Sequence, residues 1–199
     1  MLSTARGSIV RIRVFVVVSA LLLVSDERSA LGNTDTWGDI SDVAQYLPAL
    51  YGLSLVAAED DEAGGIQLGV TFLATAGTVS GLKSVIDKRR PEAAPGDRED
   101  AFPSGHTGRA WAGAAFVHRR YGCYRLEWDC WRRSAPAYGL ATLTAFGRIA
   151  ADEHDAVDVL GSAVVAETIA WLVVDRFDPN TIVTPSLENG FGIRILRRF

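Results

Sequence analysis

The clearest chemical signal in this chain of 199 residues is a histidine with a carboxylate four residues later, at His154 and Asp158. At this spacing on a helix the carboxylate reaches one ring nitrogen of the histidine. The contact fixes the tautomer and makes the other nitrogen a better nucleophile or base. Arg148 comes six residues before His154, so the chain between them must bend if both face one site. A helix salt bridge beside a structural histidine is the alternative interpretation.

A second histidine lies in the sequence Pro-Ser-Gly-His-Thr at residues 103–107, directly before an alanine-rich segment at residues 109–118. This change in character predicts a helix N-terminus, with free N–H groups and the positive end of the helix dipole. Ser104 can cap the helix or donate to an anion, and Gly105 lets the backbone approach one closely. In that case His106 is expected to lie beside an anion bound at the helix N-terminus. The alternative is a capped helix with a surface histidine.

Two cations precede these histidines, Lys83 and Arg90, and they are seven residues apart. This spacing predicts that both lie on one helix face, two turns apart. Pro91 disfavours helix at Arg90 and places its guanidinium near the helix end. Two cations on one face suit an anion with several oxygens. The alternative is a solvated basic face that also includes Lys88 and Arg89.

Taken in order, the three clusters resemble the three-part signature of the type 2 phosphatidic acid phosphatase and vanadium haloperoxidase superfamily. The matching positions are Lys83, Arg90 and Pro91, then Pro103, Ser104, Gly105 and His106, and finally Arg148, His154 and Asp158. The resemblance covers roughly residues 65–175. One departure is Gly147, because the family usually has a serine before this arginine, and its loss removes one hydrogen bond to a phosphate.

The resemblance implies an all-α fold, a helical bundle of the acid phosphatase and haloperoxidase type, and phosphohydrolase chemistry without a metal ion or other cofactor. Five groups are expected to hold the phosphate: Lys83, Arg90, Arg148, Ser104 and the Gly105 amide. His154, oriented by Asp158, is expected to attack phosphorus and form a phosphohistidine. His106 is expected to protonate the leaving oxygen and then to activate the water that releases phosphate.

His118, the third histidine, matches none of these clusters, and we expect it to be exposed at a helix end. A metal site built from the three histidines is disfavoured, because neither spacing between them is a recognised short ligand pair. Arg109 follows His106 by three residues on the same helix face. It is either a further phosphate contact or part of a surface salt bridge.

Helices are the elements that must position these groups. Apolar segments predict them at residues 66–82, 109–118, 136–151 and 157–174. The last of these contains Asp158 and Glu167, which are expensive in hydrocarbon, so bundle-core helices and membrane spans are equally compatible with the pattern. At the C-terminus, β-prone runs at residues 181–187 and 191–196 flank an Asn-Gly pair, which predicts a short β-hairpin packed against the bundle.

The N-terminus resembles an export signal. Arg6, Arg11 and Arg13 precede an apolar run at residues 14–24, which suits a signal h-region and is too short to span a bilayer. Residues 1–32 are therefore expected to be a cleaved signal peptide or an uncleaved membrane anchor. In an oxidising compartment Cys123 and Cys130 form a disulfide loop, or they remain two thiols.

Composition limits the class of protein. Apolar residues make up 48% of the chain and charged residues 22%, which excludes a disordered chain. The mean hydropathy of +0.13 is low for a protein made mostly of membrane spans. A formal net charge of −4 makes nucleic acid an unfavourable partner. After the N-terminal segment we expect a phosphatase domain at residues 33–177 and a C-terminal tail at residues 178–199.

The expected function is hydrolysis of a phosphate monoester or diphosphate, in the periplasm or on the outer face of the cytoplasmic membrane. Export, apolar helices and the aromatic loop at residues 121–131 favour a phosphorylated lipid substrate and a membrane surface as partner. Two alternatives remain open at this stage. One is an acid phosphatase of soluble phosphomonoesters, and the other is a catalytically silent envelope protein with the same fold.

Overall fold

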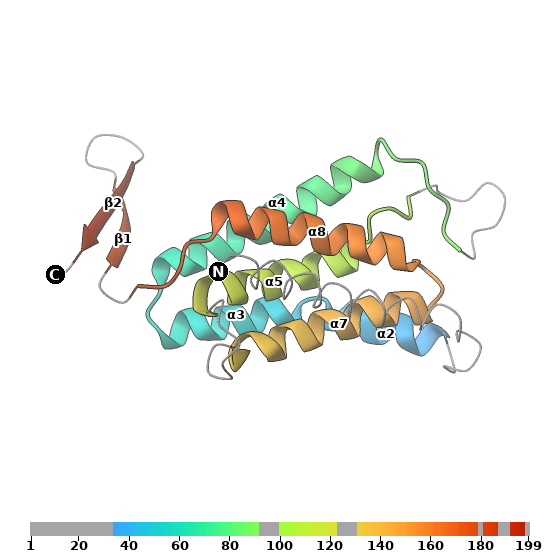
Figure 1. Cartoon of the computed structure of the whole chain (residues 1–199), viewed down its shortest axis with the longest axis horizontal. Coiled ribbons are helices and arrows are strands. Elements are labelled where there is room, and N and C mark those ends of the chain that lie inside the picture. The colour runs from blue at the N-terminus through green and yellow to red at the C-terminus, as the bar shows by residue number, and fades with distance from the viewer. Residues whose placement is uncertain (1–33, 92–99, 123–130, 179–180, 187–191, 198–199) are drawn as a thin grey trace, which may run out of the picture.

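The computed structural model describes residues 34–91, 100–122, 131–178, 181–186 and 192–197. The predicted export signal and both cysteines lie outside these residues. Six helices make up most of the described chain, which confirms the predicted all-α bundle (Figure 1). They are α2 (Thr34–Ala44), α3 (Leu47–Ala58), α4 (Glu62–Lys83), α5 (Gly105–Tyr121), α7 (Ser134–Ala150) and α8 (Ala156–Val173). The division of the chain near residues 32 and 177 stays a prediction.

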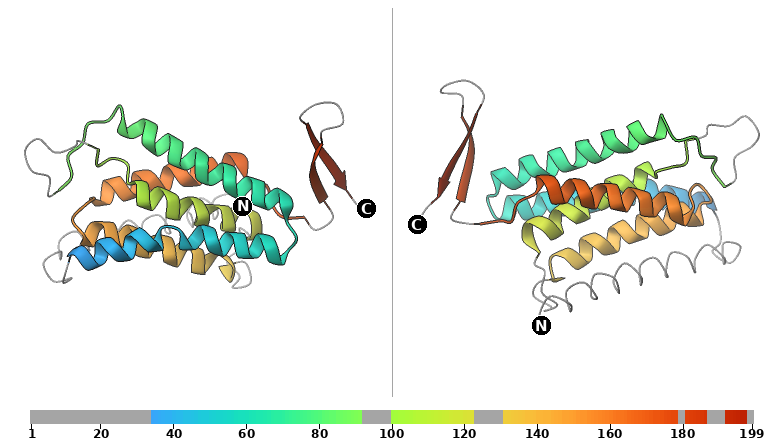
Figure 2. Two further views of the ribbon diagram at one scale, coloured as in Figure 1. Left: turned by 180° about the vertical axis from the view of Figure 1, so that it is seen from behind. Right: turned by 45° about the horizontal axis from the view of Figure 1, so that its top comes forward.

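Helix α5 is the central element, and α3, α4, α7 and α8 all pack against it. Both views in Figure 2 show these helices arranged around α5, roughly along its length. The alanines that made this segment recognisable are fully buried, as are Phe116 and Val117 beside them. Small side chains allow neighbouring helices to approach closely, so the alanine-rich composition of α5 follows from its central position.

Helix α2 was not predicted, because its sequence is polar and shows no apolar periodicity. Its buried residues are Ser41 and Ala44, on the side that packs against α7. The apolar Ile40 and Val43 on the same helix are exposed. Tertiary packing against α7 therefore stabilises a helix whose own sequence gives little sign of it.

The outer surface of the bundle is apolar on α4 and α8. Both helices are long and apolar enough to cross a membrane, yet only 22% and 33% of their most apolar windows are buried. Leu73 on α4 and Leu172 on α8 are about 70% exposed. Glu167, the acidic residue in the middle of α8, faces inward and accepts hydrogen bonds from Trp111 Nε1 (3.1 Å) and Tyr138 Oη (2.7 Å). Because this carboxylate faces inward, it argues less strongly against a membrane-spanning α8.

A buried ion pair closes one end of the bundle. Asp61 caps α4 and accepts from the Gly64 amide at 2.9 Å. It also accepts from Arg120 Nε at 2.7 Å and from Tyr121 Oη at 2.7 Å. Helix α4, with 22 residues, spans about 33 Å from this end to the other at 1.5 Å per residue. That length is close to the thickness of a bilayer's hydrocarbon core.

Two short strands follow α8, β1 (Thr181–Ser186) and β2 (Gly192–Arg197). They pair antiparallel, with Thr181 opposite Arg197 and Ser186 opposite Gly192. In Figure 1 they lie beyond the C-terminal end of α8, away from the charged clusters predicted above. The Asn-Gly turn lies outside the described residues and stays a prediction.

The crossing of α3 and α5 yields the first testable expectation. A Cβ added at Gly113 would lie only 2.7 Å from the backbone carbonyl carbon of Pro48 and even closer to the Ala49 nitrogen. Backbone atoms cannot move aside as a flexible side chain can, so Gly113→Ala should destabilise the protein by about 1–3 kcal/mol. The measurement is the melting temperature of the purified protein in detergent.

Gly139→Ala is the matched control, because a Cβ at Gly139 on α7 meets nothing within 4 Å. It should leave the melting temperature unchanged or raise it, since alanine favours helix over glycine. Equal melting temperatures for the two variants would contradict the close α3–α5 crossing.

Candidate active site

The predicted clusters meet at one end of the bundle, the right-hand end in Figure 1. Lys83 ends α4, Ser104 and His106 lie at the start of α5, and Arg148 is in the last turn of α7. His154 precedes α8 and Asp158 lies in its first turn. The polar end of each helix therefore contributes a group to the same region. The groups also interact electrostatically, because the positive charges of Arg148 and Lys83 both lower the pKa of His154.

His154 and Asp158 are both buried, and His154 Nδ1 lies 3.4 Å from Asp158 Oδ2. The backbone N–H of Asp155 donates to the same carboxylate oxygen at 3.1 Å and holds its orientation. Burial, with the nearby cations Arg148 and Lys83, lowers the pKa of His154 below its ordinary value. His154 is thus a neutral imidazole near pH 7, and Nδ1 is the ring nitrogen directed to Asp158.

The bend predicted between Arg148 and His154 is present. Helix α7 ends at Ala150, and Asp152 adopts a positive φ of 57° in the turn that follows. The backbone N–H of His154 donates to the carbonyl of Arg148 at 3.2 Å. This turn brings the two side chains to the same end of the bundle.

Ser104 caps α5, as predicted: its Oγ accepts from the backbone N–H of Thr107 at 3.4 Å. It also accepts from the Thr107 hydroxyl at 3.1 Å. Gly105 is the first residue of α5 and His106 the second. Burial and the nearby Arg148 guanidinium lower the pKa of His106 to about 4.

Arg90 and Arg148 converge on one carboxylate. Arg90 NH1 donates to Glu153 Oε2 at 2.7 Å, and Arg148 NH2 donates to the same oxygen. Arg148 is 3% exposed, and its Nε has no hydrogen-bond partner among the described residues. Lys83 donates through Nζ to the carbonyl of Asp100. Two guanidinium groups on one oxygen form an arrangement that suits a multiply charged anion.

Lys83 and Arg90 do not share a helix face, so that prediction is wrong. Helix α4 ends at Lys83 and the next two residues form a turn. Further on, the backbone of Lys88 pairs with Asp100, and the Ala101 N–H donates to the Lys88 carbonyl at 2.9 Å. This extended pairing replaces the helical hydrogen bonds, and Arg90 reaches the site from a loop.

Three charged residues at the site were not singled out as functional. Lys88 donates through Nζ to Asp158 Oδ1 at 2.6 Å and to Asp155 Oδ2 at 2.7 Å. Although burial acts in the opposite direction, these hydrogen bonds raise the pKa of Lys88. Glu153 joins the two arginines, and Asp42 on α2 contacts Arg148 NH1 at 3.2 Å. Only the position of Glu153 next to His154 could have hinted at any of them.

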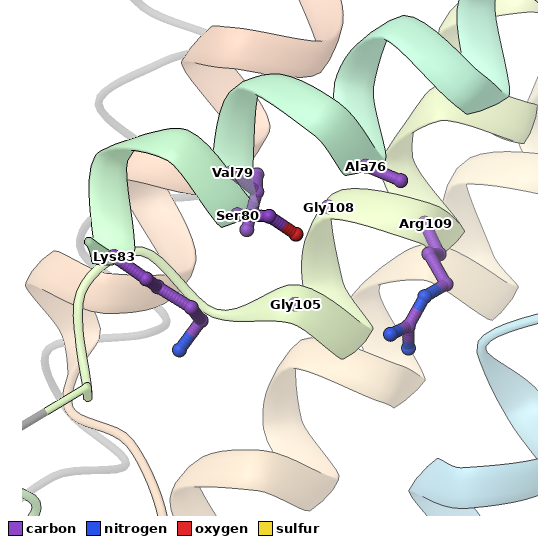
Figure 3. A pocket seen from close by; sticks show the side chains of 7 residues that line it. All are labelled: Ala76, Val79, Ser80, Lys83, Gly105, Gly108 and Arg109. Carbon is purple, nitrogen blue, oxygen red and sulfur yellow. The ribbon is translucent and has the colours of Figure 1, made fainter. Parts of the chain in front are cut away.

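A recess of about 120 Å³ opens between α4 and α5 at the edge of this region (Figure 3). Ala76 and Val79 line it, with Lys83 on one side and Arg109 on the other. Arg109 NH1 donates to the side-chain carbonyl of Gln45 on α2. Arg109 therefore has a neutral partner, which differs from the expected alternative of a surface salt bridge.

His118 takes no part in the site. It lies twelve residues after His106 on α5, which is about 18 Å along the helix axis. It was expected to be exposed, but it is half-buried and its ring stacks on Trp131 with centroids 5.0 Å apart. The aromatic neighbours explain the difference. A site shared by all three histidines is excluded by this distance.

Gly147, the departure from the family pattern, makes room for α2. A Cβ added there would lie 3.0 Å from Ser41 Cβ and 3.2 Å from the Trp37 carbonyl oxygen. Ser41 is fully buried, and its Oγ accepts from Arg148 NH1 at 3.3 Å. The hydroxyl beside the arginine thus comes from α2 and not from the preceding residue.

The arrangement can bind an anion with several oxygens and present it to a neutral imidazole. Arg90 and Arg148 supply cations, and the start of α5 supplies free backbone N–H groups. A buried His–carboxylate pair lies beside them, and a second histidine stands at the edge of the same region. These are the requirements for displacement at the central atom of an oxyanion.

Comparison with known proteins identifies related chains. The PAP2 superfamily model matches residues 64–182. The lipid A 4'-phosphatase of Helicobacter pylori is 29% identical over 162 residues, which cover 77% of each chain. The lipid A 1-phosphatase of Porphyromonas gingivalis is 36% identical over 96 residues, which cover 48% of this chain and 20% of that protein.

Two solved structures share the fold. The crystal structure of Aquifex aeolicus LpxE has a TM-score of 0.56 and 17% identity, covering 78% of this chain and 92% of that one. The transmembrane PAP2-type phosphatidylglycerolphosphate phosphatase of Bacillus subtilis has a TM-score of 0.56 and 21% identity, covering 78% and 83%. At these identities the likeness concerns the fold.

The close approach of α2 to Gly147 leads to a stability prediction. Gly147→Ser restores the residue usual in the family, but its side chain would press against Ser41. We expect a loss of about 1 kcal/mol from this overpacking, seen as a lower melting temperature in detergent.

Gly139→Ser on the same helix is the matched control, because the space around Gly139 is open. If Gly147→Ser proves as stable as Gly139→Ser, the packing of α2 on α7 described above is incorrect.

Proposed function

The chain belongs to the PAP2 superfamily, and we propose that this phosphatase removes phosphate from lipid A or a similar phosphorylated lipid, without a metal ion, through a phosphohistidine on His154. The observation that carries the proposal is the buried His154–Asp158 pair beside a set of converging cations. The lipid A phosphatases among its relatives support the choice of substrate. The steps below follow from the chain's own residues.

Binding begins at the cations. Phosphate oxygens can replace the Glu153 carboxylate between Arg90 and Arg148, because a phosphate offers more charge and more acceptor oxygens. The buried Arg148 Nε, which has no partner among the described residues, gains one from the same phosphate. Lys83 and the backbone N–H groups at Gly105 complete the set of donors around the equatorial oxygens.

The covalent step follows at His154. Its Nε2 lone pair attacks phosphorus, a P–N bond forms, and the P–O bond to the lipid breaks with its electron pair leaving on oxygen. His106 gives its proton to that oxygen. A water molecule, deprotonated by His106, then attacks phosphorus and breaks the P–N bond. Asp158 stabilises the positive charge that develops on the His154 ring, and Lys88 holds the Asp158 carboxylate in place.

A lipid substrate also agrees with the surface of the bundle. The apolar, exposed faces of α4 and α8 suit a bilayer. The structural neighbour from Bacillus subtilis is a transmembrane protein, which also supports membrane association. The site then lies at one end of the hydrocarbon layer, at the level of lipid head groups. We place that end on the outer side of the cytoplasmic membrane, because residues 1–32 resemble an export signal or anchor.

The central test is phosphate release in EDTA from lipid A, phosphatidic acid, a polyprenyl diphosphate and p-nitrophenyl phosphate. We expect release from lipid A at the highest kcat/KM, and a loss of at least 1,000-fold in kcat for His154→Ala, since the nucleophile is removed (about the scale known for such removals). Rapid quenching in alkaline denaturant, in which the P–N bond of a phosphohistidine is stable, should trap labelled phosphate on the wild-type protein and none on the variant.

His118→Ala is the control histidine variant and should retain activity, since His118 lies far along α5. Preference for p-nitrophenyl phosphate over all lipids would favour the soluble acid phosphatase instead. No release from any substrate would favour a silent envelope protein.

The two histidines also set the pH dependence. His154 must be neutral to attack, so kcat/KM rises with pH through its pKa, which lies below the ordinary value of about 6.5. His106 must be protonated to assist departure, so kcat/KM falls as pH rises through its pKa of about 4. We therefore expect a bell-shaped profile with an acidic optimum and a fall of about tenfold per pH unit on its alkaline side.

The measurement is kcat/KM for a lipid phosphate from pH 3 to 9, corrected for ionisation of the substrate phosphate. His106→Asn should remove the alkaline limb. A profile that stays flat across this range would exclude the assignment of the two histidines.

A further inference from the structure

We propose that α2 is part of the active site and that Asp42 is a positioning residue, which aims His106 at the leaving oxygen and keeps a proton on its ring. The inference rests on the phosphatase function proposed above. Helix α2 lies outside residues 64–182, which match the PAP2 superfamily model, so the role proposed for it goes beyond the matched motifs.

One carboxylate oxygen contacts two side chains of the site. Asp42 Oδ1 lies 2.9 Å from His106 Nε2 and 3.2 Å from Arg148 NH1. A leaving oxygen on a phosphate held by Arg148 must occupy nearly the same place to receive the proton of His106. Asp42 therefore directs the His106 N–H toward that place before the substrate arrives.

Helix α2 is held firmly enough to do this. Ser41 accepts from Arg148 on one side of Asp42, and Gly147 allows this approach. On the other side Gln45 is 3% exposed and donates through Nε2 to the Asp42 carbonyl at 2.7 Å. The same Gln45 side chain accepts from Arg109 of α5. The backbone of Asp42 is thus fixed by contacts to both α5 and α7.

The charges around His106 show why it needs an acidic partner. Arg148 from α7, Arg109 from α5 and His154 from the turn before α8 all disfavour the protonated ring, as does burial. Asp42 from α2 acts against them and raises the pKa of His106. Without Asp42 the protonated fraction of His106 in the free enzyme would fall, and with it the fraction competent for general acid catalysis.

The two histidine–carboxylate pairs differ in a way that matches their roles. Asp158 is fully buried and stays with the nucleophile, whereas the Asp42 side chain is 58% exposed. An exposed carboxylate can withdraw into water when phosphate oxygens take its place on Arg148. The proton then passes from His106 Nε2 to the leaving oxygen, and His106 regains a proton from the attacking water.

The test compares two leaving groups in Asp42→Asn. The oxygen of dioctanoyl phosphatidic acid needs a proton to depart, whereas p-nitrophenolate departs without one. We expect kcat/KM at pH 7 to fall about tenfold for phosphatidic acid, as for a one-unit decrease in the His106 pKa, and to change less than threefold for p-nitrophenyl phosphate. The alkaline limb for phosphatidic acid should move to lower pH, and Asp42→Glu should recover part of the loss.

Asp39→Asn is the matched control, an exposed carboxylate one turn earlier on α2, and it should resemble the wild type. Equal losses on both substrates would assign Asp42 a purely structural role, and equal gains would make it a competitor of phosphate at Arg148. Either result overturns the proposal. A wild-type protein inactive on lipid A as well as on both of these substrates overturns the phosphatase function itself, which no result on Asp42 alone would do.

Discussion

The functional end of the bundle depends on one buried charge, the guanidinium of Arg148. A cation that is 3% exposed is costly unless anions and acceptors surround it. Asp42 comes from α2 and Glu153 from the turn after α7, and each brings another element with it. Glu153 also binds Arg90 and so holds its loop, and Asp42 also contacts the ring of His106. Substrate phosphate, in the proposed function, takes over the contacts that these carboxylates make in the free protein.

Burial acts on the two histidines in the same direction but serves different chemistry. The pKa of each ring is lowered, because burial disfavours the charged form and Arg148 lies near both of them. For a nucleophile this is useful, because the neutral ring is the reactive one. For a proton donor it is a disadvantage that a nearby carboxylate must offset. In the proposed mechanism, the different exposures of Asp158 and Asp42 suit these opposite demands.

Local spacing explains which parts of this site could be predicted from the sequence. The His154–Asp158 contact and the Ser104 cap depend on neighbours three or four residues away, and helix geometry fixes both. Arg148 and Asp42 are 106 residues apart, and no periodicity relates them. Arg90 was assigned to a helix face because seven residues suggest two turns, whereas backbone pairing of Lys88 with Asp100 ends that pattern. The general bundle followed from apolar segments, but α2 depends on tertiary packing.

The same packing connects the apolar outer surface of α4 and α8 with the charged end of the bundle. Helix α5 is lined with alanine, so its neighbours approach closely and their large apolar side chains, such as Leu73 and Leu172, are left on the outside. Charged groups then gather at the two ends of the bundle, with Asp61 and Arg120 at one and the cluster around Arg148 at the other. With α4 and α8 across a bilayer, as proposed, a lipid can lie along the apolar surface while its phosphate reaches the cations at the end. Asp42 and Glu153 at that end are partly exposed, so water has access there, as the proposed hydrolysis of a phosphohistidine requires.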